Sequence, residues 1–426
     1  MRAGGGGARP RRFSRRLLAG AAATAVTAIG LPVLPATTAA ADTPGQCTYP
    51  ADPYKGRPWA LQRVLLDELW KQSTGKGVRV AVIDTGVDIR HPQLRGAVDA
   101  GAGLNTLPKD GKDAGGNAID RGAANGTTDS VGHGTKVAGI IAARPAEGTG
   151  FVGLAPGATV IPIKQNDGEG RGTAATLARA IRHAVDEGAG VINISQDTVN
   201  AVKPDPLLLQ AVNEALKEGT VVVASAGNDG LGGNVKKTYP ASFEGVIAVA
   251  SSDRNNERAA FSQSGDFVDV AAPGVDIITT VPGGGHCADN GTSFSAPYVA
   301  GLAALIKSKH PRWTPRQITA QIQQTAERST DGHDRLVGWG VADPVRALTE
   351  DDRPIERPAA GEGVTAAQTP TPPEVHLGES PDERDTRLAA YVVVGGGVLV
   401  AAIAGGAIAL RDARRRTGRT ARAGAE

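Results

Sequence analysis

Hydrophobic residues in the middle of the chain fall into short runs separated by longer mixed segments. Runs without polar alternation predict buried strands at Val78–Ile83, Val160–Ile163, Val191–Ile194, Val221–Ser225 and Val246–Ala250. The segments between them predict helices at Thr135–Ala143, Ala174–Glu187 and Pro206–Lys217. The alternation of strands and helices predicts an α/β domain over residues 78–348, with helices on both faces of a central, mostly parallel sheet.

The chain begins with the features of a secretory signal peptide. Paired arginines at 11–12 and 15–16 precede an apolar run over 17–34 and the small residues Ala39, Ala40 and Ala41. We predict cleavage after Ala41, by the general or the twin-arginine export route, with an uncleaved anchor as the alternative. Residues 42–77 are then an N-terminal extension, whose amphipathic stretch from Trp59 to Trp70 is predicted to pack on the domain that follows.

The other end of the chain predicts a membrane anchor. Residues 349–387 form a Pro-rich linker, and residues 388–410 contain no charged side chain. As a helix, these 23 residues would span about 34 Å, enough for the core of a bilayer. Six arginines lie in the tail over 411–426, so the positive-inside rule places the C-terminus in the cytoplasm and the body of the protein outside the cell.

The net charge, the cysteines and the metal-binding motifs indicate which binding partners and cross-links to expect. The formal charge of +2 gives no electrostatic reason to expect nucleic acid. The two cysteines, Cys47 and Cys287, lie in the segment predicted to be exported, where thiols are usually oxidised, which predicts one disulfide between them. No zinc-binding spacing, phosphate loop or calcium loop stands out, so we expect no metal and no cofactor.

Two segments predict an acid and a base. In GVRVAVIDTGVD, Asp84 ends a buried strand and so lies at the carboxyl edge of the sheet, where open α/β sheets place their sites. In DSVGHGTKVAGII, His133 stands between glycines that allow close backbone approach, at the start of a helical run. An acid that orients a base is one half of the machinery that activates a serine.

Two further segments predict a nucleophile and an oxyanion donor. In NGTSFSAPYVAGLAAL, Ser293 begins a helix, with Pro297 expected in its first turn and Ser295 as a packed helix residue. In VVVASAGNDG, a buried strand leads to Asn228, whose amide can donate to a developing oxyanion. His286 is expected to be a loop residue rather than a second base.

Together, the four segments resemble the subtilisin family of serine proteases over about residues 59–348. The lead-in RPWALQRVLLDELW, the DTGVDIRHPQL stretch, the Pro-rich linker and the C-terminal span more closely resemble the mycosins, membrane-anchored subtilases associated with type VII secretion. The resemblance implies that Asp84 orients His133, that His133 is the general base and then the acid, and that Ser293 is the nucleophile. The amide of Asn228 and the backbone N–H of Ser293 would form the oxyanion hole.

The resemblance also implies where a substrate binds. A peptide would add as a strand between Gly168-Glu169-Gly170 and Asn193-Ile194-Ser195. The chain departs from the family at Lys136, where many members carry His, and at Gln196-Asp197, where they carry Leu-Gly. The polar side chains of Gln196 and Asp197 predict a narrow substrate preference.

Two functions follow from these expectations. The first is an extracellular endopeptidase, anchored in the cell membrane by a single span, that cleaves a limited set of exported proteins or peptides and is associated with a type VII secretion complex. The alternative is a mainly structural subunit of such a complex, with proteolysis secondary or blocked by the N-terminal extension. All four catalytic positions are filled, which favours the endopeptidase.

Overall fold

A parallel sheet forms the centre of the protein in the computed structural model, which describes residues 47–111, 120–167, 172–195, 204–232, 237–361 and 381–420. Its seven strands follow the order β2-β3-β1-β4-β5-β6-β7, and every neighbouring pair is parallel. The strands are β1 (Arg79–Asp84), β2 (Leu104–Asn105), β3 (Thr159–Lys164), β4 (Val191–Ile194), β5 (Val221–Ser225), β6 (Ile247–Ser252) and β7 (Val270–Pro273).

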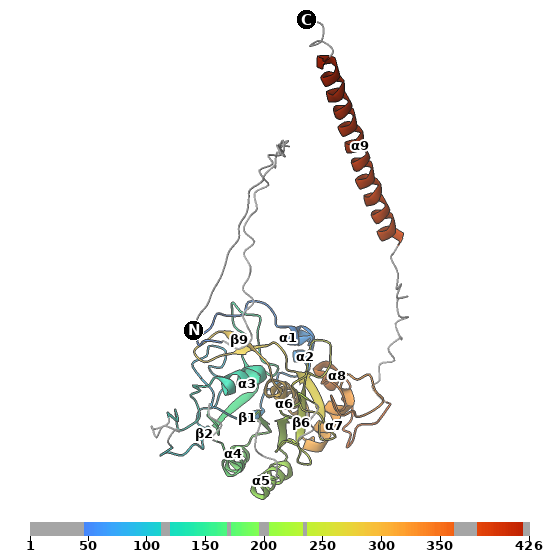
Figure 1. Ribbon diagram of the computed structural model, residues 1–426. Coiled ribbons are helices and arrows are strands. Elements are labelled where there is room, and N and C mark those ends of the chain that lie inside the picture. Colours follow the sequence, from blue (N-terminus) through green and yellow to red (C-terminus); the bar gives the residue numbers. More distant parts are fainter. Residues whose placement is uncertain are drawn as a thin grey trace, which may run out of the picture. The chain divides into compact units, whose positions relative to one another are not determined.

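Helices cover both faces of this sheet (Figure 1). Helices α3 (His133–Ala142) and α6 (Thr292–Lys309) pack on one face, and α4 (Ala174–Asp186) and α5 (Pro206–Lys217) pack on the other. Alternate residues of a strand point to opposite faces, so Val80 and Val82 enter the first core, while Ala81 and Ile83 enter the second. Because hydrophobic clusters cover both faces, the strands are mostly apolar, and the predicted fold class is confirmed.

The segment before β1 contributes to the same core. The sequence predicted one amphipathic stretch, whereas the structure has two short helices, α1 (Trp59–Gln62) and α2 (Leu66–Gln72). Leu61, Leu66 and Leu69 are each 1% exposed and belong to the cluster that contains Val80. The remaining elements of the globular part are α7 (Pro315–Thr325), α8 (Pro344–Thr349) and the antiparallel pair β8 (Ile277–Thr280) and β9 (His286–Asp289).

A covalent link joins the first described residues to β9. The predicted disulfide between Cys47 and Cys287 is present, with the two Cα atoms 6.1 Å apart. Backbone hydrogen bonds from Ala51 N to Gly284 O and from His286 N to Asp52 O continue the contact. We call residues 47–54 the N-terminal arm.

The C-terminal helix α9 (Pro381–Thr420) contains the predicted membrane segment. Its portion Arg384–Arg411 has a mean hydropathy of 2.3 and is fully exposed. Among the described residues, it is the one helix long and apolar enough to cross a membrane. An apolar surface of this kind is stable only when lipid or protein covers it.

Candidate active site

The four predicted catalytic residues lie where strands of the sheet end. Asp84 is the last residue of β1, and Asn228 follows the end of β5. His133 is the first residue of α3, and Ser293 is the second residue of α6. Since β1 and β5 are parallel members of one sheet, their carboxyl ends meet at a single edge.

Asp84 and His133 form a direct hydrogen bond. His133 Nδ1 lies 2.7 Å from Asp84 Oδ1, and the backbone N–H of Thr85 donates to the same oxygen over 2.7 Å. Asp84 is fully buried, whereas 28% of the His133 side chain is exposed. Because a carboxylate oxygen accepts hydrogen bonds, Nδ1 is the donor in this contact, and in the neutral ring Nε2 carries the lone pair.

Glycine makes this approach possible. A Cβ atom at Gly134 would lie 2.1 Å from Gly86 O and 3.1 Å from the Cβ of Asp84. No side chain fits there, so α3 can pack against the end of β1 only with glycine after His133. The helix also begins at His133 itself, two residues before the predicted start.

Electrostatics favour the protonated form of His133. Burial alone would lower the pKa of His133, but the charge of Asp84, its hydrogen bond, and the charges of Asp129 and Asp289 together raise it. An imidazole with a raised pKa binds a proton more firmly once it has taken one. This suits a base that holds a proton during a reaction and then returns it.

Ser293 and Asn228 face the same small space beside Gly291. The N–H and hydroxyl of Thr292 donate to Asn228 Oδ1 over 2.9 and 3.0 Å. Because a backbone N–H only donates, this contact identifies the amide oxygen and places Nδ2 at the other end of the group. A Cβ atom at Gly291 would lie 3.0 Å from Ser293 Oγ and 3.7 Å from Asn228 Nδ2, so both atoms border one point.

Ser293 lies near His133, and its neighbour Phe294 contacts the imidazole ring. Among the described residues, no hydrogen bond joins the Ser293 hydroxyl to the imidazole. The ring of Phe294, the next residue, lies 5.3 Å from the ring of His133, measured between centroids. Hydrogen bonds of this kind are often long in structures without substrate and tighten when it binds.

Three expectations about neighbouring residues have different outcomes. Ser295 is a packed helix residue as predicted: it is fully buried, and its hydroxyl lies 2.8 Å from Ser251 Oγ. Pro297 is not in the first turn, since α6 begins at Thr292 and the proline lies inside the helix. His286 was predicted to be a loop residue but lies in β9, 8% exposed, because pairing with β8 fixes it there.

The structure describes only part of the two segments that were predicted to bind substrate. Gly168, Glu169 and Gly170 lie outside the described residues, as do Gln196 and Asp197. Asn193 and Ile194 are paired with β1 on one side and with β5 on the other. The prediction that a substrate strand adds there is wrong for these two residues, because neither has a free edge.

Ser195 follows the last paired residue of β4. It is 2% exposed, and its hydroxyl accepts a 2.7 Å hydrogen bond from Asn193 Nδ2. The side chains of both residues therefore stabilise the end of β4. The expectation of a substrate strand remains at Ser195, the first residue beyond the sheet.

No pattern in the sequence indicated several residues that surround the Asp84–His133 pair. Asp129 accepts hydrogen bonds from both sides of His133, and Lys164, at the end of β3, contacts the residue after Asp84. Lys136, the departure noted above, forms a 2.7 Å ion pair with Asp289. Asp129 stood in the same motif as His133, and Lys164 was the lone charge that ended an apolar run, but neither pattern indicates a role.

The residues in view form no metal site. Over the described ranges, no three His, Cys, Asp or Glu side chains are grouped as ligands would be. The expectation of no metal and no cofactor stays a prediction.

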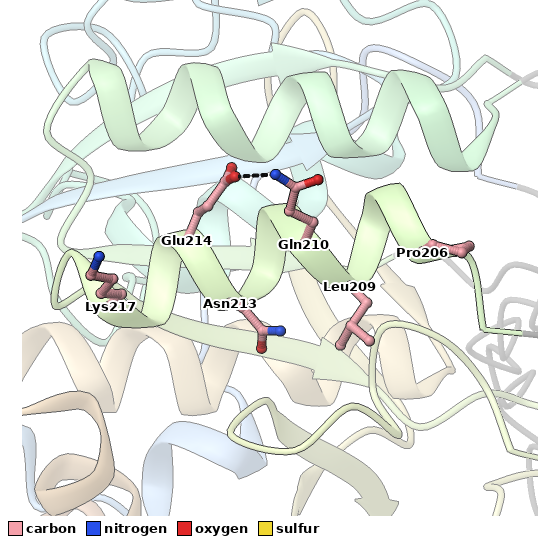
Figure 2. A pocket seen from close by; sticks show the side chains of 6 residues that line it. All are labelled: Pro206, Leu209, Gln210, Asn213, Glu214 and Lys217. Carbon is pink, nitrogen blue, oxygen red and sulfur yellow. Dashed lines mark hydrogen bonds between the residues drawn. The ribbon is translucent and has the colours of Figure 1, made fainter.

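A hollow of about 370 Å³ lies elsewhere, along the outer side of α5 (Figure 2). Its lining comes from α5 alone: Pro206, Leu209, Gln210, Asn213, Glu214 and Lys217. Gln210 donates to Glu214 over 2.7 Å across it. Because α5 covers the face opposite α3 and α6, this hollow does not belong to the candidate active site.

Comparison with known proteins agrees with this geometry. The sequence profile of the subtilase family matches residues 75–340. Subtilisin Savinase from Lederbergia lenta is 37% identical over 285 residues, which are 67% of this chain and 96% of the relative. The chain belongs to the subtilase family and is a serine endopeptidase of the subtilisin type.

Comparison with solved structures indicates a more specific group of similar proteins. The MycP3 protease from the type VII (ESX-3) secretion system matches with a TM-score of 0.59 and 32% identity, over 71% of this chain and 90% of that one. MycP1 from Mycobacterium smegmatis matches with a TM-score of 0.58 and 33% identity, over 73% and 89%. These two structural neighbours are mycosins, in agreement with the resemblance read from the sequence.

Proposed function

We propose that this protein is a membrane-anchored endopeptidase that cleaves a limited set of exported proteins through Asp84, His133 and Ser293, with Asn228 in the oxyanion hole. The observation that carries the proposal is the 2.7 Å contact between His133 Nδ1 and Asp84 Oδ1 at the edge of the sheet where Ser293 and Asn228 also lie. This arrangement leaves Nε2 of the neutral His133 ring as the base.

The chemistry follows from this tautomer. His133 Nε2 takes the proton of Ser293 as its oxygen attacks the carbonyl carbon of a peptide bond, and Asp84 stabilises the imidazolium that forms. Asn228 Nδ2 and the backbone N–H of Ser293, near the start of α6, donate to the oxygen that becomes negative. His133 then gives its proton to the leaving amine as the C–N bond breaks, and the acyl group stays on Ser293. Water gives a proton to His133 and attacks the acyl carbon, and the acid leaves as His133 returns the proton to Ser293.

The chain ends support a place at the membrane. In the proposed organisation, residues 1–41 are a signal peptide, 42–77 an N-terminal extension, 78–348 the catalytic domain and 349–387 a linker. Residues 388–410 span the cell membrane, and the Arg-rich tail 411–426 lies in the cytoplasm. The apolar, exposed surface of Arg384–Arg411 supports the span, and the likeness to MycP1 and MycP3 supports an association with type VII secretion.

A fluorophosphonate probe tests the catalytic assignment, because it bonds only to an activated serine. The detergent-solubilised full chain is labelled beside Ser293→Ala and Ser295→Ala. Ser295 is the matched control, since it lies on the same helix two residues away and bonds to Ser251. We expect labelling of the wild type and of Ser295→Ala, and none of Ser293→Ala.

Two results would count against the proposal. Labelling that survives Ser293→Ala would move the nucleophile to another residue. A folded wild type that takes no label would favour the structural role, with the cleft blocked.

A further inference from the structure

A cluster of charged and hydroxyl side chains lies behind the Asp84–His133 pair. Asp129, in the loop before α3, is 4% exposed, and Lys164, the last residue of β3, is 1% exposed. Burying a charge is costly unless hydrogen bonds or an opposite charge compensate it. Neither residue has a role in the mechanism above, so their burial needs an explanation.

Asp129 accepts five hydrogen bonds. Its Oδ1 takes them from Thr85 Oγ1 at 2.9 Å, Val131 N at 3.1 Å and Gly132 N at 2.8 Å. Its Oδ2 takes them from Thr135 N at 2.9 Å and Thr135 Oγ1 at 2.7 Å. One carboxylate therefore fixes residues on both sides of His133 and the residue that follows Asp84.

The two hydroxyl groups identify the charge state of Asp129. Thr85 Oγ1 accepts the N–H of Gly134 over 2.9 Å, and Thr135 Oγ1 accepts the N–H of Asp88 over 3.0 Å. Each hydroxyl is thus free to point its own proton at Asp129. Burial raises the pKa of Asp129, and the hydrogen bonds from Thr135 and Gly132 act against this rise. Because all five neighbours donate and none accepts, the geometry favours the ionised carboxylate.

Lys164 reaches the same place from β3. Asp84 and Lys164 lie opposite one another in the β1–β3 pairing, and the Lys164 ammonium donates to Thr85 O over 2.6 Å. Burial lowers the pKa of Lys164, and the carboxylates of Asp129, Asp167, Asp120 and Asp84 act against that lowering. Its positive charge is therefore the counter-charge to the buried carboxylates.

We propose that Asp129 and Lys164 are positioning residues of the catalytic centre, which hold Thr85 and the loop around His133 and set, with opposite signs, the pH range in which His133 is a free base. The inference rests on the proposed function, because it assigns these residues to the reaction of Ser293. The carboxylates that face His133 are those of Asp84, Asp129 and Asp289, and the last is paired with Lys136.

The test compares Asp129→Asn with Lys164→Met in the detergent-solubilised full chain, with a peptide substrate. We expect kcat to fall on the order of 10- to 100-fold in each variant, because a small displacement of a catalytic base costs about that much. KM should stay unchanged, since both side chains are buried. Loss of the negative charge should move the acid limb of the kcat/KM profile to lower pH, and loss of the positive charge should move it to higher pH.

Two variants serve as matched controls. Asp88→Asn removes another buried carboxylate, which bonds to Arg90 and to Gly283 N. Lys307→Met removes another lysine that donates to a backbone carbonyl, that of Gly219, over 2.7 Å. We expect both controls to keep the wild-type kcat and acid limb.

A readout that does not need hydrolysis separates this inference from the proposed function. In the full chain labelled with ¹³C-histidine, the resonance that disappears in His133→Asn reports the titration of His133 directly. Shifts of its midpoint in opposite directions in the two variants support the inference even if the wild type proves inactive. An inactive wild type would contradict the proposed function alone.

Other results would overturn the inference. It fails if both variants keep the wild-type kcat and titration, or if their midpoints shift in the same direction. Should the charge variants not fold, Thr85→Val removes the hydroxyl that joins Asp129 to Gly134 while keeping the side-chain shape. We expect it to lower kcat about 10-fold with KM unchanged, and a wild-type kcat there would refute the positioning role.

Discussion

Two histidines of this protein, His133 and His286, are each held by hydrogen bonds, and the charge of their hydrogen-bonding partners differs. His133 donates to the carboxylate of Asp84. His286 lies 2.7 Å from Gln93 Oε1 at its Nε2 and accepts the N–H of Tyr54 at its Nδ1 over 3.1 Å. Gln93 Nε2 donates to two backbone carbonyls, so the atom facing His286 is the oxygen, and His286 is held as the neutral ring.

The pKa values of the two rings diverge accordingly. Negative charge raises the pKa of His133 despite its burial. Burial, followed by the charge of His91, lowers the pKa of His286 to about 4. The same residue type thus becomes a proton-handling group at one site and a neutral structural group at the other, and the partner decides which.

The largest effect should come from making the His133 site resemble the His286 site. Asp84→Asn gives His133 a neutral partner whose amide can hold the wrong tautomer. We expect kcat to fall about 10⁴-fold, measured with a peptide substrate, while thermal unfolding shows that the chain stays folded. A variant that kept a tenth of the wild-type rate would show that the charge of Asp84 is dispensable.

Removal of the disulfide should act on the His286 site alone. The double variant Cys47→Ser with Cys287→Ser releases the N-terminal arm from β9 and frees a long loop in the unfolded chain. We expect the free energy of unfolding, measured with urea, to fall by about 4 kcal/mol. Labelling of Ser293 in the folded fraction should persist, and its loss would mean that the arm also supports the active site.

Low pH should reduce the contribution of His286 to the stability of the folded protein. The folded protein holds His286 neutral down to about pH 4, whereas the unfolded chain takes up the proton near pH 6.5. Its contribution to stability is therefore fully present above about pH 6.5 and declines as the pH falls toward 4, by at most about 3 kcal/mol. His286→Gln should flatten this part of the stability profile, and an unflattened profile in this variant would assign the acid sensitivity elsewhere.

The smallest effect concerns the contact between the two regions. The Tyr49 hydroxyl, in the arm, donates to Val131 O over 3.1 Å, two residues before His133. Tyr49→Phe should reduce the free energy of unfolding by about 1 kcal/mol and leave kcat unchanged. A clear drop in kcat with unchanged stability would instead make Tyr49 part of the positioning of His133.

Local patterns in the sequence were sufficient for five of the seven strands, β1, β3, β4, β5 and β6, because parallel strands buried on both faces must be apolar throughout. The two edge strands, β2 and β7, were not predicted. Local patterns were also sufficient to place Asp84, His133, Asn228 and Ser293 at ends of elements, because glycines and helix starts mark those positions. Asp129 and Lys164 could not be found in this way. Their common partner, Thr85, comes into reach of Lys164 only through the pairing of β1 with β3, and of Asp129 only through the packing of α3 against the end of β1.

The paired edges of β4 were missed for a similar reason. Whether Asn193 and Ile194 have a free edge depends on which strands lie beside them, and strand order does not follow from a single run of residues. His286 likewise lies in a strand because it pairs with β8, a short strand that the hydrophobic pattern did not indicate.

The disulfide between Cys47 and Cys287 has a consequence for a protein that cuts peptide bonds. It makes a covalent ring of the chain between two residues that are 240 positions apart, and this ring includes Asp84, His133 and Asn228. A single backbone cut inside the ring leaves both pieces attached. Molecules nicked by themselves or by neighbours would therefore migrate as one band on a gel without reductant and as two bands with it.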